Sequence, residues 1–302
     1  MTATRVAVVG LGDIAEKAYL PVIASRTDLS VILVTRNAAT LRRVGSQYRL
    51  PDQYTDLDAA ISSGLDAAFV HTSTDSHIAV VSRLLTAGIP VFVDKPLAYR
   101  YDDAARLVEL SRVSGAPLMV GFNRRYAPAY VEIAGWPRRD LVILQRNKNG
   151  PLEDPRRSVY DDFIHNVDTL RFLGARAGSA SVAGKVVDGL LHHVSVSLSD
   201  GVDVAIALMS RVAGMSEECL EVLAPGRKRR VLNIAETIDF EGGEQKHRRD
   251  EWRPVGVQRG FSQMCQAFLD GLSTGAWPDI ADALATHELC EDIVTRLQVA
   301  GG

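Results

Sequence analysis

The sequence predicts an α/β protein in which a doubly wound parallel sheet is followed by an α+β domain with a predominantly antiparallel, open sheet. In about the first 120 residues, continuous Val/Ile-rich runs alternate with amphipathic stretches, which is typical of strands covered by helices on both faces. After about residue 123 the pattern changes to period-two strands joined by short turns. We therefore predict a first domain over residues 1–122 and a second over residues 123–302.

The strands of the first domain are predicted from five apolar runs, at residues 6–9, 31–34, 67–70, 91–93 and 118–122. The stretches between them predict helices that begin near Asp13, Ala38, Leu57, Asp75 and Asp102. Thr74 or Asp75 is expected to cap the helix that follows the third strand. Pro21 is expected to bend or restart the first helix, because proline has no backbone N–H group.

Period-two patterns predict the sheet of the second domain. Its strands are expected at residues 141–147, 181–187, 194–198, 202–208, 218–223, 230–234 and 237–240. Asp200-Gly201, between two of these segments, predicts a hairpin. Helical patterns cover residues 161–173, 260–272 and 280–297, and the last two are candidates to pack back on the first domain.

The overall composition is that of a globular protein, with 46% hydrophobic residues and a formal net charge of -3. Such a charge provides no long-range field for nucleic acid or acidic lipid. The basic cluster Arg227-Lys228-Arg229-Arg230 follows a Pro-Gly turn without stacking aromatic residues. We interpret the cluster as a solvated hairpin and expect no nucleic-acid partner.

Cysteine usage and hydropathy bear on the compartment. Cys219, Cys265 and Cys290 are widely spaced and predict neither a disulfide framework nor a zinc site. No run reaches the roughly 18 to 20 apolar residues that cross a bilayer. The N-terminus enters a strand pattern without the features of a secretory signal. We therefore expect a cytoplasmic protein with no membrane partner.

A glycine-rich turn, Gly10-Leu11-Gly12-Asp13-Ile14-Ala15, follows the first predicted strand. Its two glycines allow a tight turn and a close approach of the backbone to a pyrophosphate, and small Ala15 lets the helix pack near the strand. The positive N-terminus of that helix then faces the phosphates. This context predicts a Rossmann dinucleotide site with cofactor contacts from Gly10, Gly12, Asp13, Ile14 and Ala15.

The end of the second predicted strand bears on which dinucleotide binds. An NAD enzyme usually places an acidic residue there for the ribose 2′-hydroxyl, and this chain has Thr35 and Arg36 instead. A hydroxyl followed by a guanidinium suits a 2′-phosphate. We therefore expect NADP to be preferred, with NAD as the alternative. The competing interpretation is that Arg36 simply points to water.

Polar residues also follow the third and fifth predicted strands. Thr72 and Ser73 come after the third, and Asn123 and Arg124 come after the fifth. Ligands bind at the carboxyl edge of such a sheet, so Thr72, Ser73 and Asn123 are candidate cofactor contacts. Asn123 and Arg124 also suit an oxygen-rich substrate. His77, near the start of the next helix, is a further cofactor candidate, with a structural role as its alternative.

A lysine stands at the end of the fourth predicted strand, in Asp94-Lys95-Pro96. Pro96 biases the residue before it toward extended geometry, so the backbone aims the ammonium of Lys95. An aimed lysine is a candidate proton donor, whereas the alternative is a surface lysine at a turn. Asp94 and Lys95 are both expected beside the cofactor.

In the second domain, Tyr160 precedes a predicted helix in which Asp161, His165 and Asp168 share one face. A carboxylate next to an imidazole forms a proton-relay pair. A metal site is the alternative, but three ligands on one helix strain the coordination geometry. We therefore expect no metal, and we take Asp161 and His165 as catalytic candidates.

These motifs, in this order and separation, resemble those of the Gfo/Idh/MocA family of NAD(P)-dependent oxidoreductases. Residues 10–21 and 121–128 are especially similar to its MviM-type branch. The resemblance implies that Lys95, Asp161 and His165 match the family's catalytic lysine, aspartate and histidine. Asp94 stands where glutamate is more usual. The resemblance also implies a homodimer or homotetramer formed through the sheet of the second domain.

The implied reaction is hydride transfer between a nicotinamide and a secondary alcohol or ketone of a sugar, a cyclitol or a nucleotide-linked sugar. Lys95 and His165 are expected to converge on the reacting oxygen, with Asp161 orienting His165. Tyr160, Asn123 and Arg124 are expected to contact the substrate as well. Two alternatives stay open: an NAD(P)-assisted glycosidase of the same fold, and a cofactor-binding regulator without turnover.

Overall fold

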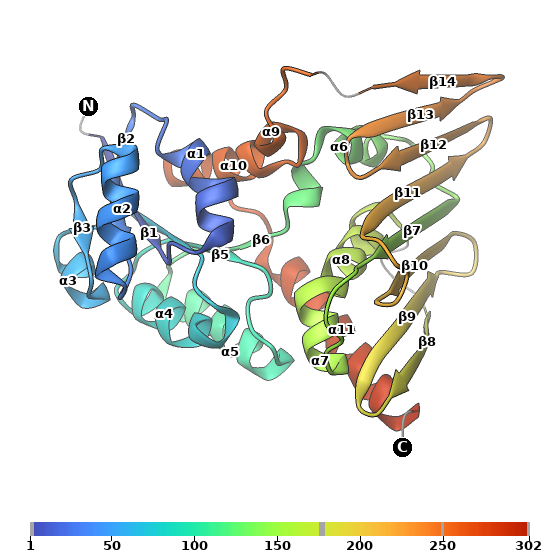
Figure 1. Ribbon diagram of the computed structural model, residues 1–302, viewed down its shortest axis with the longest axis horizontal. Coiled ribbons are helices and arrows are strands. Elements are labelled where there is room, and N and C mark those ends of the chain that lie inside the picture. The colour runs from blue at the N-terminus through green and yellow to red at the C-terminus, as the bar shows by residue number, and fades with distance from the viewer. Residues whose placement is uncertain (1–2, 175–178, 249–250, 301–302) are drawn as a thin grey trace. The chain divides into compact units, whose positions relative to one another are not determined.

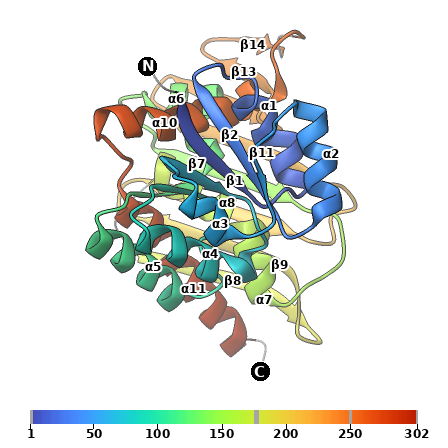
Figure 2. The same ribbon diagram turned by 90° about the vertical axis from the view of Figure 1, so that its left-hand side faces the viewer.

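The computed structural model describes residues 3–174, 179–248 and 251–300 (Figures 1 and 2). The chain forms two compact units, the first from Met1–Gly121 with Phe261–Leu284 and the second from Phe122–Gly260 with Ala285–Gly302. The first unit thus ends one residue before the expected boundary. It also includes a later segment that the prediction had named as a candidate to return to it.

The first unit contains the parallel sheet that the sequence predicts. Its six strands lie in the order β3-β2-β1-β4-β5-β6, so the chain reverses direction across the sheet between β1 and β4. Side chains in the middle of these strands, such as Ala7 and Phe69, are completely buried. The strands are β1 (Thr4–Val9), β2 (Leu29–Val34), β3 (Gln53–Tyr54), β4 (Ala67–Val70), β5 (Val91–Asp94) and β6 (Leu118–Gly121).

Helices cover both faces of this sheet, with α1 and α10 on one side and α4 and α5 on the other (Figures 1 and 2). The first helix is a π-helix, η1, and it gives way to α1 at Leu20, next to Pro21. The cap of α4 is Ser73, so the prediction of Thr74 or Asp75 was wrong by one or two positions. The helices are η1 (Ala15–Tyr19), α1 (Leu20–Ile23), α2 (Ala38–Tyr48), α3 (Leu57–Ser62), α4 (Thr74–Thr86), α5 (Tyr101–Ser114) and α10 (Phe261–Thr274).

The second unit contains an open eight-stranded sheet in the order β14-β13-β12-β11-β7-β10-β9-β8. All neighbouring strands are antiparallel except β7 and β10, which are parallel. This arrangement confirms the predicted fold class. The strands are β7 (Leu141–Asn147), β8 (Ser179–Val187), β9 (Leu190–Ser199), β10 (Val204–Ser210), β11 (Glu217–Ala224), β12 (Arg227–Leu232), β13 (Glu236–Phe240) and β14 (Glu244–His247).

The hairpin at Asp200 has a longer turn than the predicted pair Asp200-Gly201. Ser199 pairs with Val204, so four residues connect β9 to β10. The Asp200 carboxylate accepts hydrogen bonds from the backbone N–H groups of Val202 and Asp203, at 3.0 and 2.8 Å. These bonds stabilise the wider turn, which the dipeptide signal does not encode.

One face of the open sheet is covered by helices. Helix α8 packs on β7 and β10. Arg296 of α11 donates a hydrogen bond to the carbonyl of Ala180 in β8, at 3.0 Å. The remaining helical segments complete the second unit: η2 (Asn123–Tyr126), α6 (Pro128–Ala134), α7 (Pro155–Arg157), the π-helix η3 (Ser158–Phe163), α8 (Ile164–Leu173), α9 (Val255–Gln258) and α11 (Ile280–Ala300), whose first turn lies in the first unit.

The opposite face of the sheet carries partly exposed apolar side chains, among them Ile143, Ile206 and Leu208. The homodimer or homotetramer expected through this sheet stays a prediction. In the part of the chain that the structure describes, no helix has the length and apolar character needed to cross a bilayer.

The basic cluster lies at the start of β12, directly after the β11–β12 turn, and it is not simply solvated. Arg229 forms two hydrogen bonds with the Asp239 carboxylate, at 2.6 and 2.8 Å. The guanidinium of Arg227 lies 3.8 Å from the ring centroid of Trp136. These charges therefore have partners within the protein.

Candidate active site

The glycine turn after β1 has the shape that the sequence predicts. Gly10 has φ +91°, and a Cβ there would lie 2.7 Å from backbone atoms of His71 and Thr72, so only glycine fits where β1 and β4 end side by side. At Gly12, by contrast, an added Cβ would have no atom of the described residues within 4 Å. The turn is therefore open on the side of its second glycine. A diphosphate fits there, against the start of the helical segment that follows.

The residues after the glycines have different surroundings. Ala15 is completely buried, as close packing of the helix on the strand requires. Ile14 is 42% exposed, which leaves an apolar side chain at the edge of the turn. Asp13 is exposed and pairs with Lys17 at 2.7 Å. Their contacts with a cofactor stay predictions.

Arg36 lies at the end of β2, next to Thr35, and is exposed. We find no hydrogen bond or ion pair for its guanidinium within residues 3–174, 179–248 and 251–300. Asn37 accepts hydrogen bonds from the N–H groups of Ala39 and Thr40, and so caps α2. The end of β2 therefore presents a free cation beside a helix N-terminus, and no carboxylate among residues 34–37.

The end of β4 presents Thr72 and Ser73, as predicted, although Thr72 Oγ1 is buried without a partner among the described residues. His77 is 1% exposed, and its Nδ1 and Nε2 lie 2.9 and 3.1 Å from the carbonyls of Pro96 and Thr72. Burial is the largest influence on His77 and lowers its pKa, against the opposing effect of the two carbonyls. His77 thus links the loops after β4 and β5, and a direct contact with the cofactor stays a prediction.

Asp94, at the end of β5, is held by two buried aromatic residues that the sequence analysis did not single out. The Tyr19 hydroxyl donates a hydrogen bond to Asp94 Oδ1 at 2.6 Å, and His71 Nδ1 lies 3.0 Å from Asp94 Oδ2. The rings of Tyr19 and His71 stack with centroids 3.9 Å apart. An ionised carboxylate only accepts hydrogen bonds, so His71 carries its proton on Nδ1. In the sequence, His71 is distinguished only by its place directly after β4.

The hydrogen bonds from Tyr19 and His71 hold Asp94, the residue before Lys95, in place. The carboxylate of Asp94 is mostly buried and has a donor on each oxygen. An added Cβ at Gly121, the partner of Asp94 in β6, would lie 3.2 Å from Tyr19 Oη, so the small residue leaves room for the hydroxyl. Asp94 therefore anchors the end of β5, and its predicted contact with a cofactor remains untested.

Replacing Tyr19 by phenylalanine is expected to lower the free energy of unfolding by about 1–3 kcal/mol, because Asp94 loses a donor in a buried setting. Chemical denaturation of both proteins measures the difference. Tyr48→Phe is the matched control, since we find no hydrogen bond for the Tyr48 hydroxyl in the described part of the chain. Equal stabilities for the two variants would contradict a role for the Tyr19 hydroxyl.

In the second unit, Asp161 and His165 lie where the π-helix η3 passes into α8. Within residues 158–170, these are the two side chains that are not buried. Asp168, expected on the same face, is instead buried, and its carboxylate accepts hydrogen bonds from Arg125 at 2.6–3.0 Å. His165 and Asp168 both belong to α8, so Asp168 is buried because it pairs with Arg125 and not because the helix changes its period. The π-helix η3 lies before them, and π-bulges are frequent at functional sites.

The three residues predicted to contact substrate alongside this pair are buried and have partners within the second unit. The Tyr160 hydroxyl donates to Glu291 at 2.9 Å, and burial raises its pKa. Asn123 donates to the carbonyl of Arg259 at 2.8 Å. Arg124 pairs with Glu218, with Nε 2.9 Å from Oε1. Their direct contact with a substrate stays a prediction.

Among the described residues, no group of three or more His, Cys, Asp or Glu side chains is arranged to hold a metal ion.

Lys95 follows β5 in the first unit, whereas Asp161 and His165 belong to the second. Their convergence on one oxygen therefore stays a prediction.

Comparison with known proteins shows the family to which the chain is similar. Residues 4–122 match the family model GFO_IDH_MocA, described as an oxidoreductase family with an NAD-binding Rossmann fold. A Salmonella typhimurium protein named as an oxidoreductase, YceM, is 35% identical over 93% of this chain and 93% of its own length. The chain belongs to the Gfo/Idh/MocA family of oxidoreductases.

Two further proteins are similar to almost the whole chain. The crystal structure of the dehydrogenase MviM from Clostridium difficile superposes with a TM-score of 0.91 at 28% identity, covering 97% of this chain and 99% of that one. This likeness supports the predicted MviM-type branch. The myo-inositol dehydrogenase Hyg17 from Streptomyces leeuwenhoekii is 25% identical over 92% of this chain and 94% of its own length.

Proposed function

We propose that this oxidoreductase transfers a hydride between a nicotinamide dinucleotide and a carbon that carries a secondary hydroxyl or ketone, in a sugar, a cyclitol or a nucleotide-linked sugar. The observation that carries the proposal is the joint presence of an open glycine turn at the switch point of the sheet and of Lys95 directly after β5. The name of the relative Hyg17 supports a polyol substrate.

The residues of the chain have separate tasks in this proposal. The turn at Gly10 and Gly12 holds the diphosphate, and the bound nicotinamide supplies the hydride donor or acceptor. Lys95 stabilises negative charge that develops on the reacting oxygen. His165, with Asp161 one helical turn away, takes up or delivers the proton of that oxygen.

We further propose that NADP is preferred to NAD. The unpaired guanidinium of Arg36 and the hydroxyl of Thr35 lie at the end of β2, where the ribose of the adenosine binds in this fold. No carboxylate is present among residues 34–37 to pair with a 2′-hydroxyl. A 2′-phosphate is therefore better matched to this edge than a hydroxyl is.

Arg36→Asp is expected to weaken NADPH binding about ten- to hundredfold, because a charge-assisted hydrogen bond is replaced by repulsion. NADH binding is expected to stay equal or to tighten. Fluorescence titration of both cofactors measures the change. Arg49→Asp, at the opposite end of α2, removes the same charge and serves as the control. Tighter binding of NADH than of NADPH by the unaltered protein would contradict the preference.

A substrate screen tests the reaction itself. Sugars, sugar nucleotides and inositols are incubated with oxidised cofactor, and the corresponding ketones with reduced cofactor, while the absorbance of reduced nicotinamide is followed. We expect turnover with at least one polyol. Cleavage of a glycosidic bond without net change in that absorbance would instead support a hydrolase, and binding of cofactor without any turnover would support a regulator.

A further inference from the structure

The inward face of the open sheet changes from apolar to charged along its strands. In the middle of β7 and β11 the inward residues are apolar and buried, as at Leu144 and Leu220. Two positions away on the same face are Arg146 and Glu218, which are direct cross-strand partners. Arg211 directly follows the neighbouring strand β10 and is 5% exposed. Charged groups at paired inward positions of two strands, with a third directly after the neighbouring strand, are unusual for a sheet face covered by helices.

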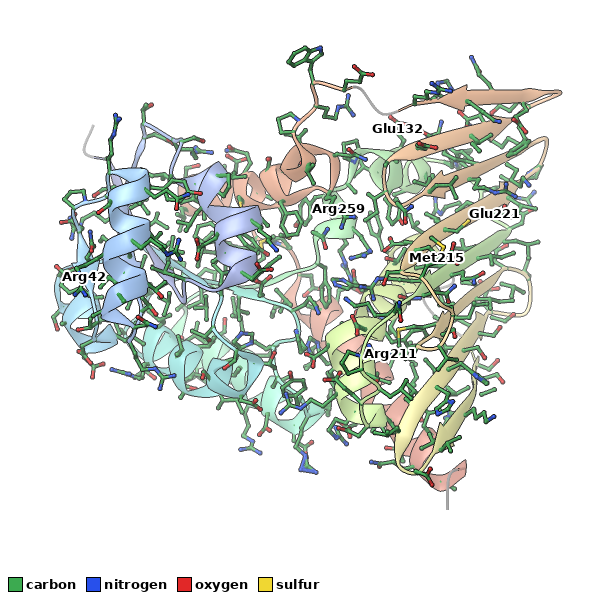
Figure 3. The ribbon with its side chains drawn as sticks, in the orientation of Figure 1. Arg42, Glu132, Arg211, Met215, Glu221 and Arg259 are labelled. Carbon is green, nitrogen blue, oxygen red and sulfur yellow. The ribbon has the colours of Figure 1, made fainter. Side chains whose placement is uncertain are left out.

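These residues form part of a larger ionic cluster. Two of its cations have close partners, although the Nε of one of them, Arg211, is buried without a partner among the described residues. Arg124 donates to Glu218 from two nitrogens, and the Tyr130 hydroxyl donates to the same carboxylate at 2.7 Å. Arg211, which is labelled in Figure 3, donates to the Asp162 carboxylate and to the carbonyl of Pro151. We define the ionic cluster as Arg124, Arg146, Lys148, Asp162, Arg211 and Glu218.

The other two cations of the ionic cluster are poorly paired. Arg146 Nε lies 3.4 Å from Glu218 and Nη2 lies 3.5 Å from Asp162, distances well beyond the usual 2.7–2.9 Å of a charge-assisted hydrogen bond. Lys148 Nζ lies 3.4 Å from Asp162, and the lysine side chain is 42% exposed. Burial lowers the pKa of Arg146, as does the like charge of Arg124, and both carboxylates oppose this effect.

Positive charge exceeds negative charge in the ionic cluster. Within the described part of the chain, its four cations contact its two carboxylates and one more, Glu153, which is 44% exposed and 3.9 Å from Arg211. A surplus charge in a largely buried place is unfavourable unless an anion accompanies it. The Lys148 side chain is 42% exposed, so an anion in solvent is able to contact its ammonium, and the Arg146 side chain keeps 13% exposure beside it.

The position of the ionic cluster relates it to the proposed chemistry. Arg146 Nη1 donates to the backbone carbonyl of Asp162 at 2.8 Å, and Asp162 is the neighbour of Asp161 in η3. The Arg146 guanidinium therefore contacts the residue that directly follows Asp161, a member of the candidate proton-relay pair of Asp161 and His165. A substrate group bound by Arg146 would lie near the backbone of Asp162, next to Asp161.

We propose that Arg146 and Lys148 bind an anionic group of the substrate, either a carboxylate or a phosphate, so that this enzyme acts on sugar acids or sugar phosphates in preference to neutral polyols. This inference rests on the proposed function, whose substrate class it narrows. Arginine suits either anion, because its planar fork pairs with two oxygens at once.

The experiment has a binding arm and a kinetic arm, both with the full chain saturated with its nicotinamide cofactor. In the binding arm, inorganic phosphate and gluconate are titrated by calorimetry. In the kinetic arm, kcat and KM are compared for gluconate and galacturonate, for inositol 1-phosphate and glucose 6-phosphate, and for the neutral inositol and glucose. Arg146→Met, Arg146→Lys and Lys148→Met are the variants. Arg138→Met is the control, because Arg138 is an exposed cation of the same unit, 63% exposed and paired with Asp140.

We expect the unaltered enzyme to prefer one anionic class over the neutral compounds at least tenfold in kcat/KM. Arg146→Met is expected to raise KM for that class about ten- to hundredfold with little change in kcat, and Arg146→Lys to restore part of the loss. Lys148→Met is also expected to raise KM for that class. Because Lys148 is half-exposed, this variant provides the test if Arg146→Met does not fold. A higher kcat/KM for the sugar acids would show that the site binds a carboxylate, and a higher kcat/KM for the sugar phosphates would show that it binds a phosphate.

Two results separate this inference from the proposed function. Turnover of neutral polyols, with KM values that Arg146→Met and Lys148→Met leave unchanged, overturns the anion site and leaves the proposed reaction standing. Calorimetric binding of phosphate or gluconate that disappears in Arg146→Met and persists in Arg138→Met, without hydride transfer to any compound, supports the anion site and overturns the proposed reaction.

Discussion

Replacing Lys95 by methionine is expected to lower turnover at least about a hundredfold while leaving NADPH affinity largely intact. A positioned proton donor or charge-stabilising group contributes on the order of 10² to 10⁴ in rate. Methionine keeps the length of the side chain but removes the ammonium. The residue before it, Asp94, is anchored by Tyr19 and His71, so the backbone at the end of β5 should not move.

The measurement combines steady-state absorbance with fluorescence titration of NADPH. Lys185→Met is the control, because Lys185 is exposed in β8 and its replacement removes one charge from the surface. Turnover within a fewfold of the unaltered enzyme would refute the role of Lys95. A parallel loss of cofactor affinity would instead show that its ammonium mainly binds the dinucleotide.

Glu218→Gln is expected to destabilise the protein by about 3–5 kcal/mol at neutral pH, because Arg124 is left buried without its counter-charge. Burial alone raises the pKa of the Glu218 carboxyl. The guanidiniums of Arg124 and Arg146 and the Tyr130 hydroxyl outweigh burial and lower the pKa from 4.5 to about 2. A difference of this size corresponds to roughly 3 kcal/mol of stability.

The lowered pKa also determines the pH dependence. Above about pH 4.5 the carboxylate is ionised in both the folded and the unfolded chain, and its contribution to stability is fully present. As the pH falls from about 4.5 to about 2, the unfolded chain takes up a proton before the folded one does, so stability decreases. Glu218→Gln should lack this part of the acid-induced decrease.

Denaturant unfolding at several pH values checks both expectations. Glu221→Gln is the matched control, since Glu221, labelled in Figure 3, lies on the same strand, pairs with Arg230 and is partly exposed. Its effect should stay within about 1 kcal/mol, as for other surface ion pairs. Equal effects of the two substitutions would mean that the buried carboxylate contributes no more than the exposed one.

Local chemistry made much of the first unit predictable. Apolar runs buried on both faces indicate parallel strands wherever they occur, and a glycine turn between a strand and a helix has one common structural meaning. Gly10 illustrates the point, because its positive φ and its close approach to the backbone of His71 and Thr72, directly after β4, both require glycine. The length of the turn at Asp200 was less predictable, because the Asp200 side chain accepts two backbone hydrogen bonds that stabilise a wider turn.

Spacing in the sequence singled out candidate residues that are close along the chain, such as Asp161 and His165, which lie in the consecutive helical segments η3 and α8. It did not anticipate contacts between residues that are remote along the chain. Tyr19 and Asp94 are 75 positions apart, and Arg124 and Glu218 are 94 apart. Nothing in the residue order says that these side chains meet, because strand order and register bring them together.

The amino-acid order by itself determined the two kinds of sheet, the dinucleotide turn and the family, because each depends on contacts between near neighbours or on short motifs. Only the tertiary structure decided which charges are paired. It gave the Asp94 carboxylate a hydrogen bond from Tyr19 and another from His71, buried Asp168 beneath Arg125, and placed Arg146 opposite Glu218 without a full set of partners. Burial and distance determine the energy of a charge, and both depend on elements that are remote along the chain.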